Sequence, residues 1–372
     1  MPSNKPIQKE RLNWVDQTKG LAILGIVLFH FFQNYPDRIH LVSILDRNGA
    51  RVGFAAVDIF FVMAGFNTSY VLALLSQKKQ LNTISTNWKS WLIKRIDRIY
   101  IPYILAVLCS LLLYHFVRVK INPDFNFFLS VLGLAGFKFQ VINPGFWFFT
   151  VILQAYIAIP IIFYLCRSNP KNILLLGIIV GVANKLACLS IGNNSDFYGY
   201  FLQNNFLGSY FFPLCLGLYW GIIYFENKSF RKKDYTLTTT VFVMGIFLYS
   251  LLLIQKVNIL YMIGFDLLFT PFLFIVCYLI FETLRKYEDR LGYVLMIFSW
   301  LGIYSYQIYL IHQPLFFVLL PRLMKPIDTD PYLKIIISLI ITICLLTIYV
   351  FSFTSLEVFL RKLVKKAANQ QA

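Results

Sequence analysis

The chain has 372 residues, of which 58% are hydrophobic and 14% are charged, and its formal net charge is +17. A soluble domain usually carries about a quarter charged residues, so this composition excludes an ordinary soluble protein. The positive charge fits the positive-inside bias of membrane proteins and contact with anionic lipid headgroups better than nucleic-acid binding, because no basic patch with interleaved aromatic residues lies outside the apolar segments. We therefore expect a membrane protein without a nucleic-acid partner.

Apolar segments recur along the whole chain, and they approach or exceed the ~20 residues that a helix needs to cross a bilayer. They predict an all-α, polytopic bundle of about ten transmembrane helices that forms a single domain, residues 1–372. The basic N-terminus could mimic a signal peptide, but Asp16 and Lys19 interrupt the first apolar run and no small-residue cleavage site follows it, so we expect an uncleaved helix. The predicted spans are 12–33, 53–76, 99–117, 146–166, 172–191, 206–225, 236–255, 259–281, 294–320 and 335–357.

A further apolar patch at 125–139 is short and contains Gly133 and Gly136. If it crossed the membrane, every later loop would change sides, and the basic clusters of those loops would face outward, against the positive-inside rule. We therefore predict a re-entrant or interfacial element on the outer side. The same rule predicts that both termini are cytoplasmic, with residues 358–372 as a short basic tail.

The cysteines lie in or beside apolar runs, and none forms a CxxC or another ligand-spaced pair. We interpret them as small packing residues rather than disulfide partners or metal ligands, so no metal site is expected. They are Cys109, Cys166, Cys188, Cys215, Cys277 and Cys344.

The first predicted helix contains three ionisable residues, which are costly inside a membrane and are often functional there. At 100° per residue, Lys19 lies about 20° and Asp16 about 40° from His30, so the three share one face. Lys19 and His30 are separated by about 16 Å along the helix axis. His30 suits proton transfer or is a satisfied polar residue, whereas Asp16 and Lys19, at i and i+3, either support the chemistry or simply neutralise each other.

The second predicted helix carries Asp58 about 20° from Gly65, so one of its faces is both charged and small. Such a face allows the close approach of another helix or of a substrate. Asp58 either belongs to the chemistry, as a partner of Lys19 or His30, or forms a structural ion pair with Lys19 or another buried cation.

The third predicted helix begins with the basic segment Lys94-Arg95-Ile96-Asp97-Arg98. Basic residues at such a place serve positive-inside topology in any membrane protein. However, Arg95 and Arg98, at i and i+3, also present two guanidinium groups on one side, which suits binding of a phosphate or pyrophosphate.

Two later segments hold further polar and aromatic candidates. Trp147 follows Asn143-Pro144-Gly145, and an interfacial aromatic belt is the alternative explanation for it. His312, before Gln313-Pro314, is either a site residue or a hydrogen-bonding residue at a helix kink. The candidates of this last segment are Ser305, Tyr306, Tyr309 and His312.

Together these segments resemble the acyltransferase-3 family of membrane acyltransferases. Lys19 and His30, with ten residues between them, match the family's first-helix pattern, although most members have Arg at the basic position. The stretch 57–66 is similar to V-D-x-F-F-V-x-S-G-F, with Ala64 in place of Ser. The resemblance, which covers residues 14–314, is completed by Arg95-x-x-Arg98-Ile99-x-x-Pro102, by the segment that Trp147 begins and by Ser305-Tyr306-x-x-Tyr309-Leu310-x-His312.

The resemblance implies an enzyme that takes an acyl group, expected to be acetyl, from cytoplasmic acyl-CoA and transfers it to a hydroxyl of a surface or lipid-linked carbohydrate. Acyl-CoA would be a co-substrate, and no permanently bound cofactor is expected. The protein would be a multi-pass protein of the bacterial inner membrane, in contact with its lipids. Besides Ala64, a second departure from the family pattern is Gln154, where some members carry an acidic residue. We also expect no appended hydrolase-like domain.

In that enzyme His30 would act as the general base or as an acyl-accepting nucleophile. Supporting catalytic roles would fall to Asp58, Lys19 and Asp16. The CoA phosphates would be held by Arg95, Arg98 and Lys94. Substrate binding would involve Trp147, Tyr306, Tyr309 and His312.

Two other functions remain open at this point. Buried Asp, Lys and His residues also suit a proton-coupled transporter or a flippase for a glycan or small solute, although the chain shows no half-to-half repeat. Ala64 keeps open an inactive scaffold within a polysaccharide-assembly complex. Dependence on acyl-CoA distinguishes the enzyme from the carrier, and the scaffold predicts that His30 and Arg95 are dispensable.

Overall fold

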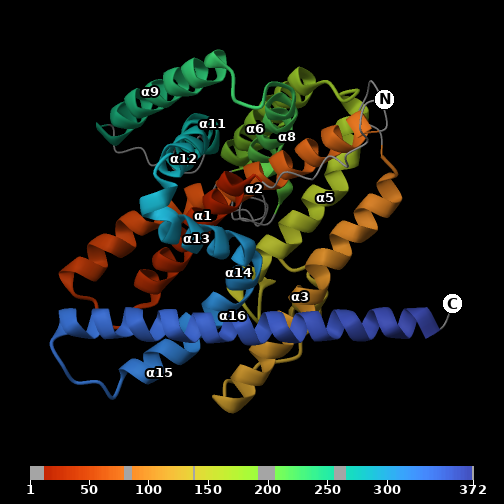
Figure 1. The fold of residues 1–372 in the computed structure, drawn as a ribbon. Helices are drawn as coiled ribbons and strands as arrows, with labels where there is room; N and C mark the ends of the chain where they lie inside the picture. The colour runs from red at the N-terminus through yellow and green to blue at the C-terminus, as the bar shows by residue number, and fades with distance from the viewer. Residues whose placement is uncertain (1–11, 79–85, 137–138, 192–205, 255–264, 371–372) are drawn as a thin grey trace.

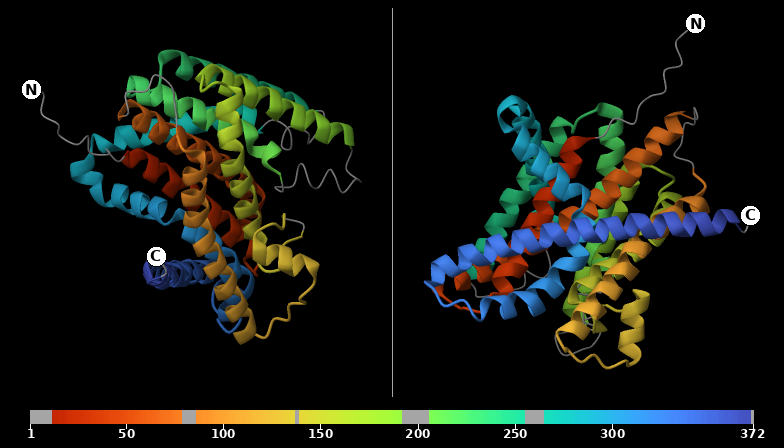
Figure 2. Two further views of the ribbon diagram at one scale, coloured as in Figure 1. Left: turned by 90° about the vertical axis from the view of Figure 1, so that its right-hand side faces the viewer. Right: turned by 60° about the horizontal axis from the view of Figure 1, so that its bottom comes forward.

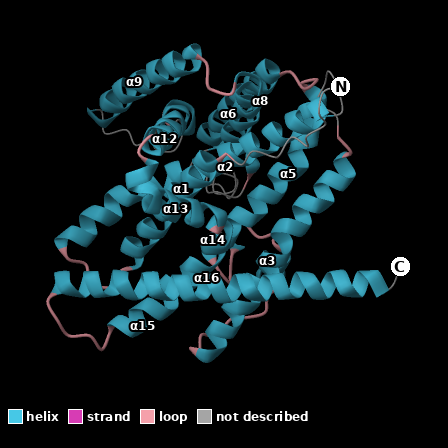
Figure 3. Cartoon of the chain, viewed as in Figure 1, coloured by secondary structure: helices cyan, strands magenta, loops and turns pink. Residues whose placement is uncertain are grey.

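The computed structural model describes residues 12–78, 86–136, 139–191, 206–254 and 265–370. These residues form helices joined by loops and contain no strand (Figure 3), which confirms the predicted all-α class. The α-helices are α1 (Asn13–Asn34), α2 (His40–Lys78), α3 (Trp88–Phe116), α4 (Phe125–Leu132), α5 (Trp147–Leu165), α6 (Pro170–Ile191), α8 (Phe211–Asn227), α9 (Lys232–Ile254), α11 (Phe265–Leu268), α12 (Thr270–Arg285), α13 (Glu288–Ile303), α14 (Ser305–Pro314), α15 (Leu320–Met324) and α16 (Pro331–Gln370).

Eight described helices are long and apolar enough to cross a membrane, or nine if the bent pair of α13 and the segment 305–324 is one span. The sequence predicts about ten. The difference lies at 259–281, where residues 259–264 fall outside the described residues and the remainder is divided into α11 and the 16-residue α12. The predicted cytoplasmic location of both termini stays a prediction.

The apolar patch at 125–139 forms α4, a helix of eight residues. The Asp124 side chain accepts a hydrogen bond from the backbone N–H of Phe127 at its start, and Gly133 ends the helix in the left-handed conformation. Eight residues span about 12 Å, which is too short to cross a bilayer. The prediction that this patch does not cross is therefore confirmed, although residues 137 and 138 lie outside the described part.

Helix α1 packs against α2, α12, α13 and α14 (Figure 1), so the face that carries the ionisable residues is turned into the bundle. Close contact with α13 depends on glycine, because a side chain on Gly302 would collide with the backbone carbonyl of Asp16. Gly65 on α2 makes the same kind of contact with the Leu214 carbonyl of α8, so the small face predicted there approaches a helix.

The chain bends by 73° between α13 and α14. Ser305 donates a hydrogen bond to the Gly302 carbonyl at 2.9 Å across the break. Pro314 lies inside α14 and is followed by a π-helical turn, Leu315–Leu319, so this segment has two interruptions of regular α-helix. The 305–314 segment thereby enters the bundle beside α1 instead of continuing α13.

Helix α16 has 40 residues, which corresponds to a length of about 60 Å, twice the hydrocarbon thickness of a typical bilayer. It contacts α3, α14 and α15. Figure 2 shows it end-on at the edge of the bundle in the left view, and crossing other helices in the right view. The predicted basic tail at 358–372 is thus helical up to Gln370 and continues α16.

We expect Gly302→Leu to destabilise the protein, because the new side chain must push α1 and α13 apart. Overpacking of this kind costs about 1–3 kcal/mol or more. The effect is measured as the thermal midpoint of the detergent-solubilised protein, monitored by size-exclusion chromatography after heating. Gly292→Leu is the matched control, because nothing lies within 4 Å of a side chain added there on the same helix. Equal midpoints for the two variants would contradict the packing argument.

Candidate functional site

Among the described residues, two neighbouring cavities are lined by the candidate site residues, and Tyr309 of α14 lines both. The first, here called the arginine cavity, has a volume of about 230 Å³, and the second, the histidine cavity, about 500 Å³. The arginine cavity is lined by Lys19, Arg95, Arg98, Tyr156, Tyr306 and Glu357, with Phe60, Ala64, Asn67, Phe148, Ser305, Gln307 and other neighbours. The histidine cavity is lined by Ile26, Phe29, His30, Gln33, Asn34, Gly53, Val57, Pro144, Trp147, Tyr210, Tyr309, Gln313 and Phe317.

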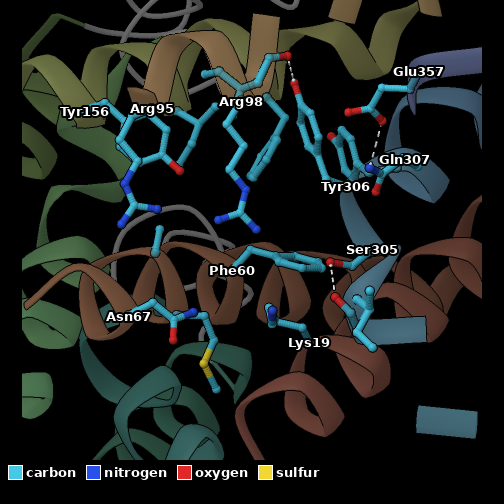
Figure 4. Close-up of a pocket in the computed structure, with 18 residues that line it drawn as sticks. Lys19, Phe60, Asn67, Arg95, Arg98, Tyr156, Ser305, Tyr306, Gln307 and Glu357 are labelled. Carbon is cyan, nitrogen blue, oxygen red and sulfur yellow. Dashed lines mark hydrogen bonds between the residues drawn. The ribbon is translucent and has the colours of Figure 1, made fainter. Parts of the chain in front are cut away.

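The arginine cavity brings together the two guanidinium groups that the spacing on α3 predicts. Figure 4 shows Arg95 and Arg98 reaching into the cavity from one side, with Lys19 on the other side. Arg95 lies over the rings of Trp91 and Tyr156, 5.5 and 5.9 Å from their centroids, which holds its planar group in place. The predicted third member, Lys94, is exposed and does not line the cavity.

The charges of this cavity are only partly compensated. Lys19 forms an ion pair with Asp16 at 2.6 Å, so the interpretation in which these two residues neutralise each other describes their contact correctly. Within the described residues, neither Arg95 nor Arg98 forms an ion pair with a carboxylate. These two guanidinium groups are therefore available to an anionic ligand.

Asp58 lies outside both cavities. It is buried and accepts a hydrogen bond from Thr270 at 2.9 Å, in a region that also holds the buried ion pair of Lys185 and Asp266, 2.8 Å apart. The expected contact of Asp58 with Lys19 or His30 is therefore wrong. The alternative of a structural ion pair is not found either: among the described residues Lys185 pairs with Asp266, and Asp58 has the Thr270 hydroxyl as its hydrogen-bond donor.

His30 lines the histidine cavity and is held between two amide side chains. Its Nδ1 lies 2.9 Å from Gln33 Oε1, and its Nε2 lies 3.1 Å from Gln313 Nε2. An amide oxygen only accepts and an amide nitrogen only donates, so this arrangement places the proton on Nδ1 and leaves a lone pair on Nε2. A lone pair in a cavity is what a general base or nucleophile requires.

His312 is fully buried beside His30, with 5.2 Å between the ring centroids. Its Nδ1 donates to the Tyr309 carbonyl at 2.7 Å, in the turn that precedes Pro314. Within the described residues its Nε2 has no hydrogen-bond partner. His312 lines neither cavity, so the structure supports the interpretation of a hydrogen-bonding residue at a helix kink and places it behind His30.

Trp147 is buried and lines the histidine cavity, which contradicts the alternative of an interfacial aromatic belt. Its ring stacks on Tyr210, with 5.6 Å between the centroids. The turn before it is fixed by Asn143, whose side chain donates to the Leu310 carbonyl at 3.0 Å and accepts from the Gly145 N–H at 2.9 Å. Five aromatic side chains, Trp147 and Tyr210 among them, and three amide side chains line this cavity.

Tyr306 and Tyr309, which the sequence resemblance gives as substrate-binding residues, both line the arginine cavity. The Tyr306 hydroxyl donates to the Ile99 carbonyl at 3.0 Å, so it also fixes α3 (Figure 4). The Tyr309 ring packs on Phe148 at 4.8 Å and forms part of the wall between the cavities.

Several residues of the two cavities were not predicted from the sequence. Gln313 directly follows His312, and Tyr156 is nine positions after Trp147 on the same helix, so their neighbours were the only signals. The other polar lining residues that the sequence did not single out are uncharged or lie outside the segments with candidate residues. They are Gln33, Asn34, Asn67, Tyr210, Gln307 and Glu357.

Comparison with known proteins gives one family. The family model of the acyltransferase-3 type, described as an acyltransferase domain, matches residues 12–354, nearly the whole chain. No curated protein matches the chain. No solved structure matches it either.

We expect Lys185→Met to destabilise the protein strongly, because it leaves Asp266 buried without its cation. Removing one partner of a buried ion pair costs about 3–5 kcal/mol. The thermal midpoint in detergent measures the loss, and Lys171→Met, an exposed position on the same helix, is the matched control. Adding Asp266→Asn to Lys185→Met should recover part of the stability. If it recovers none, the unpaired charge of Asp266 is not the cause of the loss.

Proposed function

Because this chain belongs to the acyltransferase-3 family of membrane acyltransferases, we propose that it transfers an acyl group, acetyl in the first instance, from acyl-CoA to a carbohydrate hydroxyl. The arginine cavity receives the donor, and the histidine cavity receives the acceptor. The proposed location is the inner membrane of a bacterium, with the donor entering from the cytoplasm, where the positive-inside rule places the start of α3.

The difference in charge between the two cavities is the main support for assigning the donor to one and the acceptor to the other. Three cations line the arginine cavity, whereas the described residues that line the histidine cavity include no Lys, Arg, Asp or Glu. CoA carries several phosphate charges, and a sugar hydroxyl carries none. Each substrate therefore fits one cavity by charge, and the two meet at Tyr309.

The size of the arginine cavity limits which part of the donor it holds. Cavities for a whole small-molecule ligand have about 300–1,000 Å³, more than the 230 Å³ available here. The cavity therefore takes the acyl end of the donor and part of its pantetheine arm. The nucleotide stays at the mouth, where Arg98 is exposed and offers a bidentate phosphate contact.

The histidine cavity has the side chains expected of a carbohydrate site. Trp147 and Tyr210 are aromatic residues of the kind that contact the apolar side of a sugar ring, and the amides of Asn34, Gln33 and Gln313 can donate and accept hydrogen bonds. These groups recognise a neutral polar ligand in surroundings without a formal charge.

His30 would act through Nε2. As a general base it takes the proton of the acceptor hydroxyl while the oxygen attacks the thioester carbonyl; the carbon–sulfur bond breaks, and the leaving CoA thiolate takes up the proton. As a nucleophile it first accepts the acyl group itself and passes it to the hydroxyl in a second step. In both routes Gln33 keeps the proton on Nδ1. The hydrogen bond from Gln313 to Nε2 must break before Nε2 can react.

We expect His30→Ala to lower transfer by at least about 100-fold, the usual size of a general-base contribution. A strain with the gene deleted is complemented with wild type or variant, and base-labile acyl esters on its surface glycans are quantified. His115→Ala, an exposed histidine of α3, is the matched control. Full ester content with His30→Ala at equal membrane abundance would exclude the catalytic role.

The same experiment separates the enzyme from a carrier. If the ester content is unchanged by deletion while a glycan or solute accumulates on one side of the membrane, the protein is a transporter. If wild type restores an ester, its chemical identity names the acyl group and the acceptor.

We expect Arg95→Ala and Arg98→Ala each to raise the KM for acyl-CoA by about tenfold with a smaller change in kcat, because they remove a charged contact made in the bound state. Lys94→Ala is the matched control and should change the KM by less than about threefold, since Lys94 does not line the cavity. Equal effects of all three substitutions would indicate a general role of positive charge instead.

A further inference from the structure

The arginine cavity has one wall that comes from the last helix of the chain. Glu357 of α16 lines the cavity, and its side chain is 9% exposed. Its Oε1 pairs with the Arg361 guanidinium at 2.9 Å, and its Oε2 accepts from Gln307 at 3.2 Å. Figure 4 shows Glu357 and Gln307 on the Tyr306 side of the cavity.

Arg361 extends from this pair to the backbone of α3. It donates to the Arg98 carbonyl at 3.1 Å and to the Asp97 carbonyl at 3.4 Å. These are the carbonyls of the turn that carries the Arg98 side chain into the cavity. No other described side chain donates to either of them.

The sequence of α3 explains why the Arg98 carbonyl accepts from another helix. Pro102 lies inside α3, four residues after Arg98. Proline has no backbone N–H, so the carbonyl of Arg98 loses its intrahelical donor. An unpaired carbonyl in a membrane protein costs free energy unless another group donates to it, and Arg361 does so.

The pair on α16 is arranged for this role. Glu357 precedes Arg361 by four residues, the order that best stabilises a helix, and it fixes the guanidinium so that its remaining N–H groups point to α3. Tyr306 holds the next carbonyl, that of Ile99. The segment around Arg98 is thus held by donors from α14 and α16.

We propose that Arg361, oriented by Glu357, is a positioning residue for the donor site: it fixes the backbone turn of Arg98 that Pro102 leaves unpaired, and so sets the Arg98 guanidinium for binding the phosphates of acyl-CoA. This inference rests on the proposed function, because it assigns a consequence for acyl-CoA binding. Arg361 itself does not line the cavity.

The first test compares the KM for acyl-CoA of the full-length protein in membranes. Arg361→Ala should raise the KM about tenfold with kcat changed less than about threefold, as expected for a lost binding contact. Arg361→Lys should raise it by a similar factor, because one ammonium group cannot span two carbonyls and a carboxylate. Lys362→Ala, an exposed cation one residue further, should leave the KM unchanged.

A second pair of variants separates position from charge. Arg361→Ala leaves the Glu357 carboxylate uncompensated at the cavity, where it would repel an anionic donor. If repulsion caused the effect, adding Glu357→Gln would restore the KM, and that result would overturn the proposal. If the backbone of α3 is responsible, the double variant stays about tenfold weaker.

Coupling to Arg98 completes the test. In an Arg98→Ala background, Arg361→Ala should raise the KM no further, because the side chain that it positions is gone. A full additional tenfold increase would exclude action through Arg98.

Direct binding of CoA to the purified protein in nanodiscs distinguishes a failure of the proposed function from a failure of the role assigned to Arg361. Absence of CoA binding by wild type would refute the proposed function and this inference with it. CoA binding by wild type and equally tight binding by Arg361→Ala would refute this inference alone.

Discussion

The contact of α1 with the bend between α13 and α14 determines where both cavities lie. Gly302 lets the two backbones approach, and the 73° turn after it directs α14 along the inner face of α1. One half of α1 then faces the start of α14, with Lys19 and Tyr306 in the arginine cavity. The other half faces the end of α14, where His30 meets Gln313. A straight continuation of α13 would build neither arrangement.

The bilayer restricts how such a bend can be made. Interrupted helix is tolerated at membrane depth only where its free backbone groups find partners inside the protein. The chain meets this requirement with side-chain donors at each interruption. Ser305 donates at the bend, Asn143 donates to the Leu310 carbonyl that Pro314 leaves without its donor, and Arg361 donates to the Arg98 carbonyl that Pro102 leaves without its donor. Irregular backbone and polar side chains therefore occur together, and the same places border the cavities. The constraint on folding and the location of the chemistry coincide.

The sequence alone predicts the class of fold and several of the residues that line the two cavities, because both depend on local patterns. The lengths of apolar segments predict membrane helices, and the i, i+3 spacing of Arg95 and Arg98 predicts that they share a cavity. The partner of Asp58 was predicted incorrectly, since α2 also packs on α8, α11 and α12, and its carboxylate reaches Thr270, 212 positions away in the chain. No periodicity within one helix contains that information.

The role of amide side chains was missed for a related reason. Helical-wheel arguments give weight to ionisable residues, because a charge in a membrane requires explanation. Gln33 and Gln313 carry no charge, yet together they determine which nitrogen of His30 bears the proton. Only the fold shows that residues on α1 and α14, remote in sequence, act on the same ring.

The length of α16 affects how the boundary of this protein should be drawn. The family match ends at residue 354, whereas Glu357 of the cavity wall and its partner Arg361 lie just beyond it on the same uninterrupted helix. A chain that ended at residue 354 would keep most of the apolar part of α16. It would lack Glu357, and so one wall of the arginine cavity. The part of α16 up to Arg361 therefore belongs to the folded unit, and any shortened chain should retain it.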